Sequence, residues 1–473
     1  MDLSVVFEIA IGCVTLLAAG LIVPKSARVA VAVSMCAAYV GMYCTHIPNV
    51  IDPTVWTPPF PLPGITRNDI LSGAARVEDP GRQLLATESF AMRRDGVVYA
   101  GTSYGVVIAL DENGRWLRDV FFVGGFVNHS VDVAWCRGLA VADKLPWDKH
   151  SEMKCGRPLG LRLAREESEL WLADAYHGIF KLSISTGVWE HVVKPEDTIV
   201  ALPFVDPNAM KRPMFFNDVV IDEARDLLFF TDSSSKHRRA QNRQEVIDGS
   251  PRGRLFARDL GGTQSLRVLL CGLHFPNGLQ LLAGGHLLVV ESARFRVLKV
   301  DAAELFEQQQ KRGLHHLSSC SEFGSTSSLL KVEETPLVSI YLDGLPGFPD
   351  NIRQMPSGLL LIGLATKSTK PFSLLYTAYQ SRWLRLAIGR LVPMRSIEHF
   401  LPRYGLVLAV PTSSGQPGEA TLLQDPDGKS ANFISEAQIH PLTGALWLGT
   451  HHNPTTLSIL PPDKLPVNMR VSQ

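Results

Sequence analysis

The sequence has no excess of charge of either sign. Its 473 residues contain 46 lysines and arginines and 46 aspartates and glutamates, so the formal net charge is zero. Proteins that bind nucleic acids need a basic surface, and we therefore expect no nucleic-acid partner. Seven cysteines are too few for a disulfide-dense miniature scaffold. Charged residues make up only 19% and hydrophobic residues 45%, which excludes disorder as the main state.

Charge is almost absent from the N-terminal segment. Residues 3–23 and 29–43 form two apolar runs, separated by a short segment that contains Lys25 and Arg28. The first run is long enough to span a bilayer and the second is short, so a single span and a two-span hairpin are both open. Positive residues stay on the cytoplasmic side, so either topology places the chain after His46 on the lumenal or extracellular side. A cleaved signal peptide is the alternative, but no charged segment precedes the first run.

Composition divides the chain into four parts. Residues 1–47 are predicted to be the membrane anchor, in the endomembrane system or the plasma membrane. Residues 48–63 contain six prolines and are predicted to form an extended stalk between membrane and domain. Residues 64–465 form the main domain, and residues 466–473 a short tail.

The main domain shows one repeated β pattern. Short apolar strands follow turn residues at intervals of roughly 55–90 residues, a spacing that indicates propeller blades with loop insertions. Six copies predict an all-β, six-bladed β-propeller, and a pair of generic β-sandwiches is the alternative. The six strands are 97–101, 170–174, 227–232, 286–291, 359–363 and 445–449.

Two insertions interrupt the repeat. Residues 304–335 contain three glutamines and then a serine-rich stretch, and we expect a helix followed by a loop. Residues 371–393 are predicted to form a helix with Leu384, Ile388 and Leu391 on one face and arginines around them. A basic amphipathic helix can lie on a membrane. We favour the other interpretation, in which this helix is a lid packed on the propeller.

Short signatures open the first strand of most repeats. They are residues 87–91 (TESFA), 155–161 (CGRPLGL), 215–219 (FFNDV), 275–279 (FPNGL) and 348–353 (FPDNIR). Residues 174–178, 231–236, 425–428 and 434–436 extend the pattern. Together these motifs resemble the strictosidine synthase-like family, most closely its adipocyte plasma membrane-associated branch. The resemblance covers residues 64–462, and the family resembled also has an N-terminal membrane anchor.

Oxygen donors recur at the starts of these strands. Propeller strands begin or end near the central channel, so Glu88, Asn217, Asn277, Asp350 and Asn351 are expected to converge on the axis. A set of carboxylate and amide oxygens without cysteine or histidine suits Ca²⁺, whereas zinc prefers nitrogen or sulfur ligands. The resemblance implies the same, because matching positions hold a catalytic calcium in the wider superfamily that includes paraoxonases and diisopropylfluorophosphatase. A turn or cap is the ordinary role of any one of these asparagines.

The expected activity follows from the charge of the calcium ion. Bound Ca²⁺ polarises a carbonyl or phosphoryl oxygen and acidifies a bound water. We therefore expect a membrane-anchored, calcium-dependent hydrolase with arylesterase-like activity on small ester or lactone substrates; organophosphates are a further substrate class. Asp350 and Glu88 are the catalytic candidates, and the sequence leaves open whether Asp350 is a ligand, a base or a nucleophile. A non-catalytic lumenal scaffold with structural calcium is the first alternative.

The sequence departs from its relatives at three positions. Leu159 stands where the paraoxonase pattern has the first histidine of a catalytic pair, and His177 is close to the second position but out of register. Lactone hydrolysis by such a pair is therefore not expected. Glu436 is the candidate for the glutamate of strictosidine synthase, but the alignment there is uncertain by one residue, which would turn the side chain to the other face. The amine–aldehyde condensation is thus the least expected function.

Two covalent features complete the expectations. The family has a disulfide leading into the Cys-Gly-Arg motif, which implies a bond between Cys136 and Cys155 in an oxidising lumen. Cys271 and Cys320 are expected to be unpaired. Asn128 belongs to the only Asn-x-Ser/Thr sequence in which x is not proline, so its glycosylation is predicted.

Overall fold

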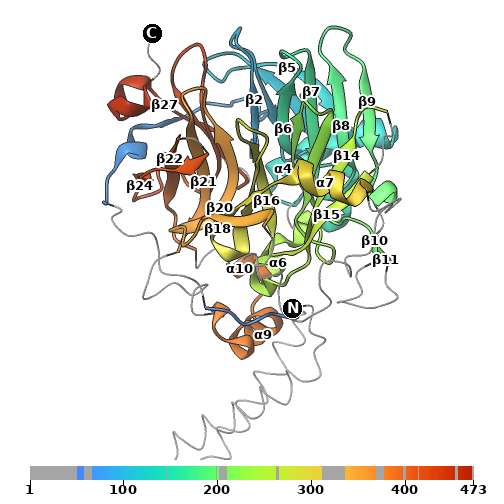
Figure 1. The fold of residues 1–473 in the computed structure, drawn as a ribbon. Coiled ribbons are helices and arrows are strands. Elements are labelled where there is room, and N and C mark those ends of the chain that lie inside the picture. The colour runs from blue at the N-terminus through green and yellow to red at the C-terminus, as the bar shows by residue number, and fades with distance from the viewer. Residues whose placement is uncertain are drawn as a thin grey trace, which may run out of the picture.

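The computed structural model describes residues 51–57, 66–145, 148–198, 200–201, 210–262, 266–311, 336–368, 378–397, 401–413, 415–452 and 456–470. Within these ranges antiparallel sheets dominate, as the sequence predicts, and helices α6, α9 and α10 lie together at one end of the molecule (Figure 1). The predicted membrane anchor lies outside these ranges. Among the described residues, no helix has the length and apolar character that crossing a bilayer requires.

The described strands form five four-stranded sheets, one five-stranded sheet and one two-stranded sheet. The first sheet contains β2 (Phe90–Met92), β3 (Val98–Gly101), β4 (Val106–Leu110) and β5 (Trp116–Phe122), and the second contains β6 (Pro158–Ala164), β7 (Glu169–Asp174), β8 (Gly178–Ser183) and β9 (Trp189–Val193). The third contains β12 (Phe216–Asp222), β13 (Leu227–Asp232), β14 (Gly253–Asp259) and β15 (Leu266–Leu273), and the fourth contains β16 (Pro276–Leu281), β17 (Leu287–Glu291), β18 (Arg296–Val300) and β19 (Val338–Leu342). The fifth contains β20 (Gly347–Gln354), β21 (Leu359–Lys367), β22 (Gly405–Ser413), β23 (Gln416–Pro417) and β24 (Thr421–Asp425). The sixth contains β25 (Ile434–Ile439), β26 (Leu446–Thr450), β27 (Ser458–Leu460) and β1 (Ala75–Arg76), while β10 (Val200–Ala201) pairs with β11 (Met210–Lys211).

The sheets are arranged around an axis as in a β-propeller. The first strand of each sheet contacts the first strand of the next, from β2 through β6, β12, β16 and β20 to β25. The ring closes where the amide of Phe90 donates to Oε1 of Glu436 at 3.0 Å. The chain ends also close it, because Ala75 of β1 pairs with Ile459 of β27 in the last sheet. Residues from the two ends of the domain therefore share one sheet, which explains why the repeat forms a closed structure.

The first strands carry a β-bulge at the same place. The pairing register shifts between Pro158 and Leu161, between Phe216 and Val219, between Pro276 and Leu279, and between Pro349 and Ile352. A bulge re-aims the side chains of the extra residues, and bulges are common beside active sites. The bulged residues are those of the sequence signatures, so the bulges determine which side chains face the axis.

Close packing at the axis requires small residues. A Cβ atom on Gly278 would lie 2.7 Å from the Cα atom of Asn351 in the neighbouring strand. Between the sheets the core is apolar. The third and fourth sheets, for example, enclose Phe229, Leu269 and Val289, none of which is exposed.

The helices occupy the connections between strands. They are α3 (Val123–Val127), α4 (Val133–Val141), α5 (Lys149–Cys155), α6 (Asn242–Asp248), α7 (Ala302–Lys311), α9 (Arg382–Leu391) and α10 (Met394–Ile397). Short 3₁₀ turns are η2 (Ile70–Gly73), η4 (Pro195–Thr198), η5 (Arg239–Gln241), η6 (Ser292–Arg294), η10 (Pro462–Lys464) and η11 (Val467–Met469). In the 304–335 insertion only the helix α7 belongs to the described residues. In the described part of the 371–393 insertion, α9 begins at Arg382, where the Ser381 side chain caps it by accepting from Leu384 N, and residues 371–377 lie outside the described residues.

Both predicted boundary segments pack against the domain. Ile51 is buried, and Oγ1 of Thr54 donates to the carbonyl of Gly249 at 3.2 Å. The part of the 48–63 linker that the structure describes is therefore bound to the domain and is not a free stalk. At the other end, Met469 lies in the core, so the packed domain continues beyond residue 465.

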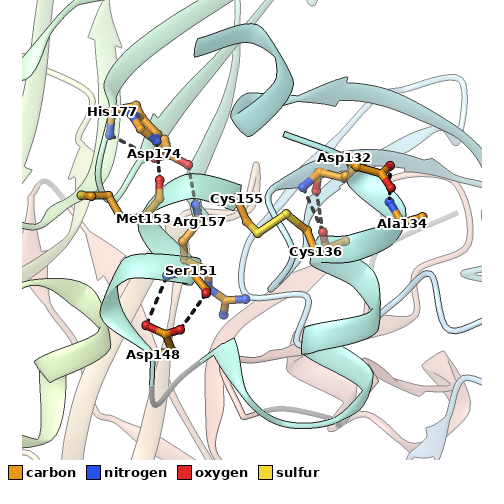
Figure 2. Close-up of a disulfide and its surroundings, with 12 residues drawn as sticks. Asp132, Ala134, Cys136, Asp148, Ser151, Met153, Cys155, Arg157, Asp174 and His177 are labelled. Carbon is orange, nitrogen blue, oxygen red and sulfur yellow. Dashed lines mark hydrogen bonds between the residues drawn. A yellow bond between two sulfur atoms is a disulfide. The ribbon is translucent and has the colours of Figure 1, made fainter. Parts of the chain in front are cut away.

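A disulfide joins Cys136 of α4 to Cys155 at the end of α5 (Figure 2). It is the bond that the family resemblance implies. Cys271 is also disulfide-bonded, so the expectation that it is unpaired is wrong. Because Cys136 and Cys155 pair with each other, the partner of Cys271 lies outside the described residues. Cys271 stands in an ordinary strand without a signature, so its neighbours in the sequence did not indicate a bond.

Candidate functional site

One pocket contains most of the predicted ligand set. Glu88, Asn217, Asn277 and Asp350 all line it, although they come from four different sheets. The rest of its wall is largely apolar and includes Phe215, Val246, Phe275, Phe348, Ile397 and Phe433. The pocket therefore combines a polar floor with walls that suit an apolar ligand.

Asn351 belongs to the same group of buried residues. It follows Asp350 in β20 and is only 1% exposed. Within the described residues it is not part of the pocket wall. The sequence predicts that Asn351 lies near the other four side chains. In the structure it directly follows Asp350, but it does not face the cavity.

Four side-chain oxygens of this group have no hydrogen-bond partner among the described residues. Within the described part of the chain, the unpartnered buried oxygens include Oδ1 of Asn217, Asn277, Asp350 and Asn351. The nitrogen of Asn217 donates to Oγ of Ser233 at 2.9 Å, which orients the amide and leaves its oxygen available. Buried polar atoms normally find partners because an unmade hydrogen bond is costly. A cation bound among these four oxygens, which come from three strands, would give each of them a partner.

The charge at the site points the same way. Burial, and then the nearby Glu88 carboxylate, raise the pKa of Asp350 well above its ordinary value. The carboxylate of Glu88 in turn is ion-paired with Nη2 of Arg157 at 2.8 Å. A cation near Asp350 would stabilise its charged form and so offset the cost of burial.

The donor set fits calcium. Two carboxylates and three amide carbonyls are hard oxygen ligands, and Ca²⁺ accepts six to eight of these in flexible geometry. Within the described ranges no three histidine, cysteine, aspartate or glutamate side chains cluster as a metal site would require. A site for zinc or another metal that prefers nitrogen or sulfur ligands is therefore not indicated there. The Glu88–Arg157 ion pair reduces the negative charge available to a cation.

His451 and His452 also line the pocket, and sequence reasoning missed both. Nδ1 of His451 lies 3.8 Å from Oδ2 of Asp350 and has no hydrogen-bond partner among the described residues. Burial, and then Arg239, lower the pKa of His451 well below its ordinary value, so both favour the neutral ring. The two histidines directly follow β26 of the sixth sheet, the place where His177 follows β7 in the second. That equivalence is the signal that could have found them.

A guanidinium group borders the same cavity. Arg239 comes from η5, in a connection without any periodic pattern, and lines the pocket. Its Nη1 lies 2.9 Å from Oε1 of Glu152, and its Nη2 lies 3.9 Å from Oε2 of Glu88. Arg239 therefore lies between the carboxylates of Glu88 and Glu152, and it adds positive charge to the pocket wall.

Glu436 lies deeper on the axis and is not part of the pocket wall. Its Oε2 lies 2.5 Å from Nη2 of Arg353, and its Oε1 accepts from the amide of Phe90. Nη1 of Arg353 lies 2.9 Å from Oδ2 of Asp218. The glutamate is thus committed to an internal ion-pair network and is not positioned to act on a ligand in the pocket.

The positions of the paraoxonase-type histidine pair do not form such a pair here. Leu159 is buried in the apolar core. His177 lies beside the disulfide region, where its Nε2 is 2.8 Å from the carbonyl of Met153 (Figure 2). His177 does not line the pocket, so its role is to hold the loop between β7 and β8 against α5.

The predicted glycosylation site lies at the surface. Asn128 is exposed at the end of α3, and its Oδ1 accepts from the amide and the hydroxyl of Ser130. The position is accessible, and glycosylation of Asn128 stays a prediction.

Comparisons with known proteins extend these observations. The Strictosidine synthase family model matches residues 217–304. The human adipocyte plasma membrane-associated protein is 32% identical over 399 residues, which cover 84% of this chain and 80% of that protein. Protein STRICTOSIDINE SYNTHASE-LIKE 2 of Arabidopsis thaliana is 30% identical over 312 residues, or 65% of this chain and 71% of that protein. Among solved structures, a gluconolactonase from Xanthomonas campestris aligns with 87% of this chain and 98% of its own at 13% identity, with a TM-score of 0.43.

Proposed function

Since this chain belongs to the strictosidine synthase-like family, together with the adipocyte plasma membrane-associated proteins, we propose that it is a membrane-anchored, calcium-dependent hydrolase of small esters or lactones. The observation that carries the proposal is the group of four unpartnered buried oxygens beside an apolar pocket. We further propose that the domain is a six-bladed propeller on the lumenal or extracellular side of the membrane.

The residues that would hold the cation are Glu88, Asn217, Asn277, Asp350 and Asn351. Two carboxylates match the charge of one Ca²⁺, and the amides complete the shell without adding negative charge. Bound calcium supplies electrostatic polarisation of a carbonyl oxygen and acidification of a water.

The side chains of the pocket provide the remaining parts of a hydrolase. The phenylalanine-rich wall can bind the acyl or aryl part of a substrate and exclude water from it. Neutral His451, beside Asp350, is placed to accept a proton from an attacking water. Asp350 and Glu88 stay the catalytic candidates among the carboxylates, and Asp350 is favoured because Glu88 is held by Arg157.

Two alternatives have less support. A non-catalytic scaffold with structural calcium would use the same ligands, but it gives no reason for a histidine without a partner on the pocket wall. An amine–aldehyde condensation would need Glu436 to face the substrate, whereas that residue is paired with Arg353 outside the pocket wall.

The test is a panel of aryl esters and lactones with the purified full-length chain, measured with calcium and with a chelator. We expect hydrolysis that the chelator abolishes and that Asp350→Ala removes. The Glu436→Gln variant, checked for folding by circular dichroism, should keep its activity. A wild-type chain that binds calcium without hydrolysing any substrate would favour the scaffold.

A further inference from the structure

Helix α9 has one packed side and one free side. Its buried residue Leu386 packs with Ile51 and Ile247 in a small apolar cluster. The guanidinium of Arg385 donates to the backbone carbonyls of Ile247 and Asp248. The helix is therefore packed on α6, which forms part of the pocket wall, and within the described residues α9 itself does not line the pocket.

The outer side of α9 presents a tryptophan to solvent. Trp383 is 78% exposed, more than nearly every other large apolar side chain among the described residues. Arg390 lies two helical turns further along and so on the same side as Trp383, where its side chain is half-buried. The described segment 378–397 carries four arginines and neither aspartate nor glutamate.

The chain that leads from the predicted membrane anchor reaches the domain at this helix. Nη2 of Arg382 is 3.0 Å from Oδ1 of Asp52, and the amide of Trp56 donates to the carbonyl of Tyr379. Residues 51–57 and α9 lie at the same end of the molecule (Figure 1). Because the predicted anchor ends at residue 47, only a few residues separate this end of the domain from the bilayer.

We propose that the outer face of α9, formed by Trp383 with Arg390 and by Arg395 of α10, docks on the phosphate-bearing interface of the bilayer that holds the anchor. Tryptophan prefers this interface because its ring is apolar and its N–H polar. Guanidinium groups bind phosphate oxygens through paired hydrogen bonds. Docking there would place the pocket, whose wall includes Ile397, next to the membrane. The inference rests on the predicted anchor for its orientation, and on α9 itself for the contact.

The test uses the full-length chain in phosphatidylcholine vesicles whose acyl chains carry bromine. An environment-sensitive fluorescent amino acid replaces Trp383, and a matched chain carries it in place of Val467, which is 79% exposed. The C-terminal end near Val467 lies opposite α9 (Figure 1). We expect roughly twofold or greater quenching at position 383 and none at 467, because interfacial helices bury their apolar side in the headgroup region.

Two further measurements distinguish membrane contact by α9 from membrane binding by the anchor. Flotation of the labelled chain with the vesicles reports the anchor alone. If the chain floats but shows no extra quenching at position 383, the anchor is supported and the docking of α9 is overturned. If the chain does not float, both the anchor and the docking of α9 are overturned. The double variant Arg390→Gln, Arg395→Gln should at least halve the quenching at 383. Unchanged quenching in that variant would overturn the assignment of phosphate as the group recognised.

Discussion

Two groups of polar residues lie on the propeller axis, and they use neighbouring positions of the same strands. The outer group contains Asn217 and Asp350, whose Oδ1 atoms have no partner among the described residues. The inner group contains Asp218 and Arg353, which are paired with each other at 2.9 Å. Along these bulged strands, a residue whose side-chain oxygen has no hydrogen-bond partner among the described residues thus lies only one to three positions from a residue that is ion-paired.

The difference lies in the balance of charge. In the inner group, two carboxylates, of Asp218 and Glu436, face two guanidiniums, of Arg162 and Arg353. Oδ2 of Asp218 also accepts from the amide of Leu279 at 2.8 Å, so this group is complete without a ligand. The outer group contains oxygen atoms without a partner among the described residues. The inner group therefore stabilises the fold, and the outer group is the one that the proposed cation would bind.

The largest expected effect comes from breaking the inner group. Asp218→Asn removes the charge that faces Arg353 and Arg162 while keeping the shape of the side chain. Leaving buried guanidiniums without their partner should lower the free energy of unfolding by about 3–5 kcal/mol. Chemical denaturation measures it, and the loss should be equal with calcium and with a chelator. A loss that calcium reverses would contradict the separation of the two groups.

The outer group should behave in the opposite way. Asn217→Ala removes one proposed ligand and should abolish the stabilisation by calcium, about 2.7 kcal/mol for the wild type at about a hundredfold excess over Kd. In the presence of a chelator the same variant should lose only about 1 kcal/mol, the contribution of its bond to Ser233.

The matched control is Ser233→Ala, which removes the same hydrogen bond and leaves the oxygen of Asn217 in place. It should keep most of the calcium effect on the melting temperature. If both variants respond to calcium like the wild type, Asn217 is not a ligand.

Much of the fold could be predicted because its determinants are local. The alternation of apolar strands and turns is visible in the sequence, and the signatures around Asn217, Asn277 and Asp350 mark the bulged strands. The predicted ligands meet on one pocket because the propeller repeats one geometry. The apolar pattern did not indicate the boundary at Ser381, because that boundary depends on a side-chain cap.

The rest of the site depends on contacts between distant segments. Arg239 reaches the pocket from a connection with no pattern, and its partner Glu152 is 87 residues away. His451 lies between β26 and β27 of the last sheet, where no signature drew attention to it. The ion pair between Glu88 and Arg157 joins two signatures that each looked independent. Such pairings arise only when the ring closes, so the sequence could not reveal which carboxylate is free.

The smallest expected effect tests whether an unpartnered oxygen by itself indicates a cation. Glu245 of α6 is fully buried, and its Oε1 has no partner among the described residues, yet no set of amide ligands accompanies it. Its Oε2 accepts from Oγ of Ser234 at 2.5 Å. Burial, and then the charge of Asp248, raise the pKa of Glu245 from 4.5 to about 8, so the folded protein holds this carboxyl in its protonated form at neutral pH.

The sign of the pH dependence follows from that shift. Because the folded state binds the proton more tightly than the unfolded state, the stabilisation is complete below about pH 4.5 and is lost as the pH rises through about 8. Between about pH 6 and about pH 8 the wild type should lose on the order of 1–2 kcal/mol more than Glu245→Gln, which cannot titrate and keeps an acceptor for Ser234. Denaturation at both pH values, repeated with calcium and with a chelator, measures the difference. If calcium removes the pH dependence, Glu245 is a second cation site; if it does not, an unpartnered oxygen indicates a metal only where, as at Asp350, several amide oxygens face the same cavity.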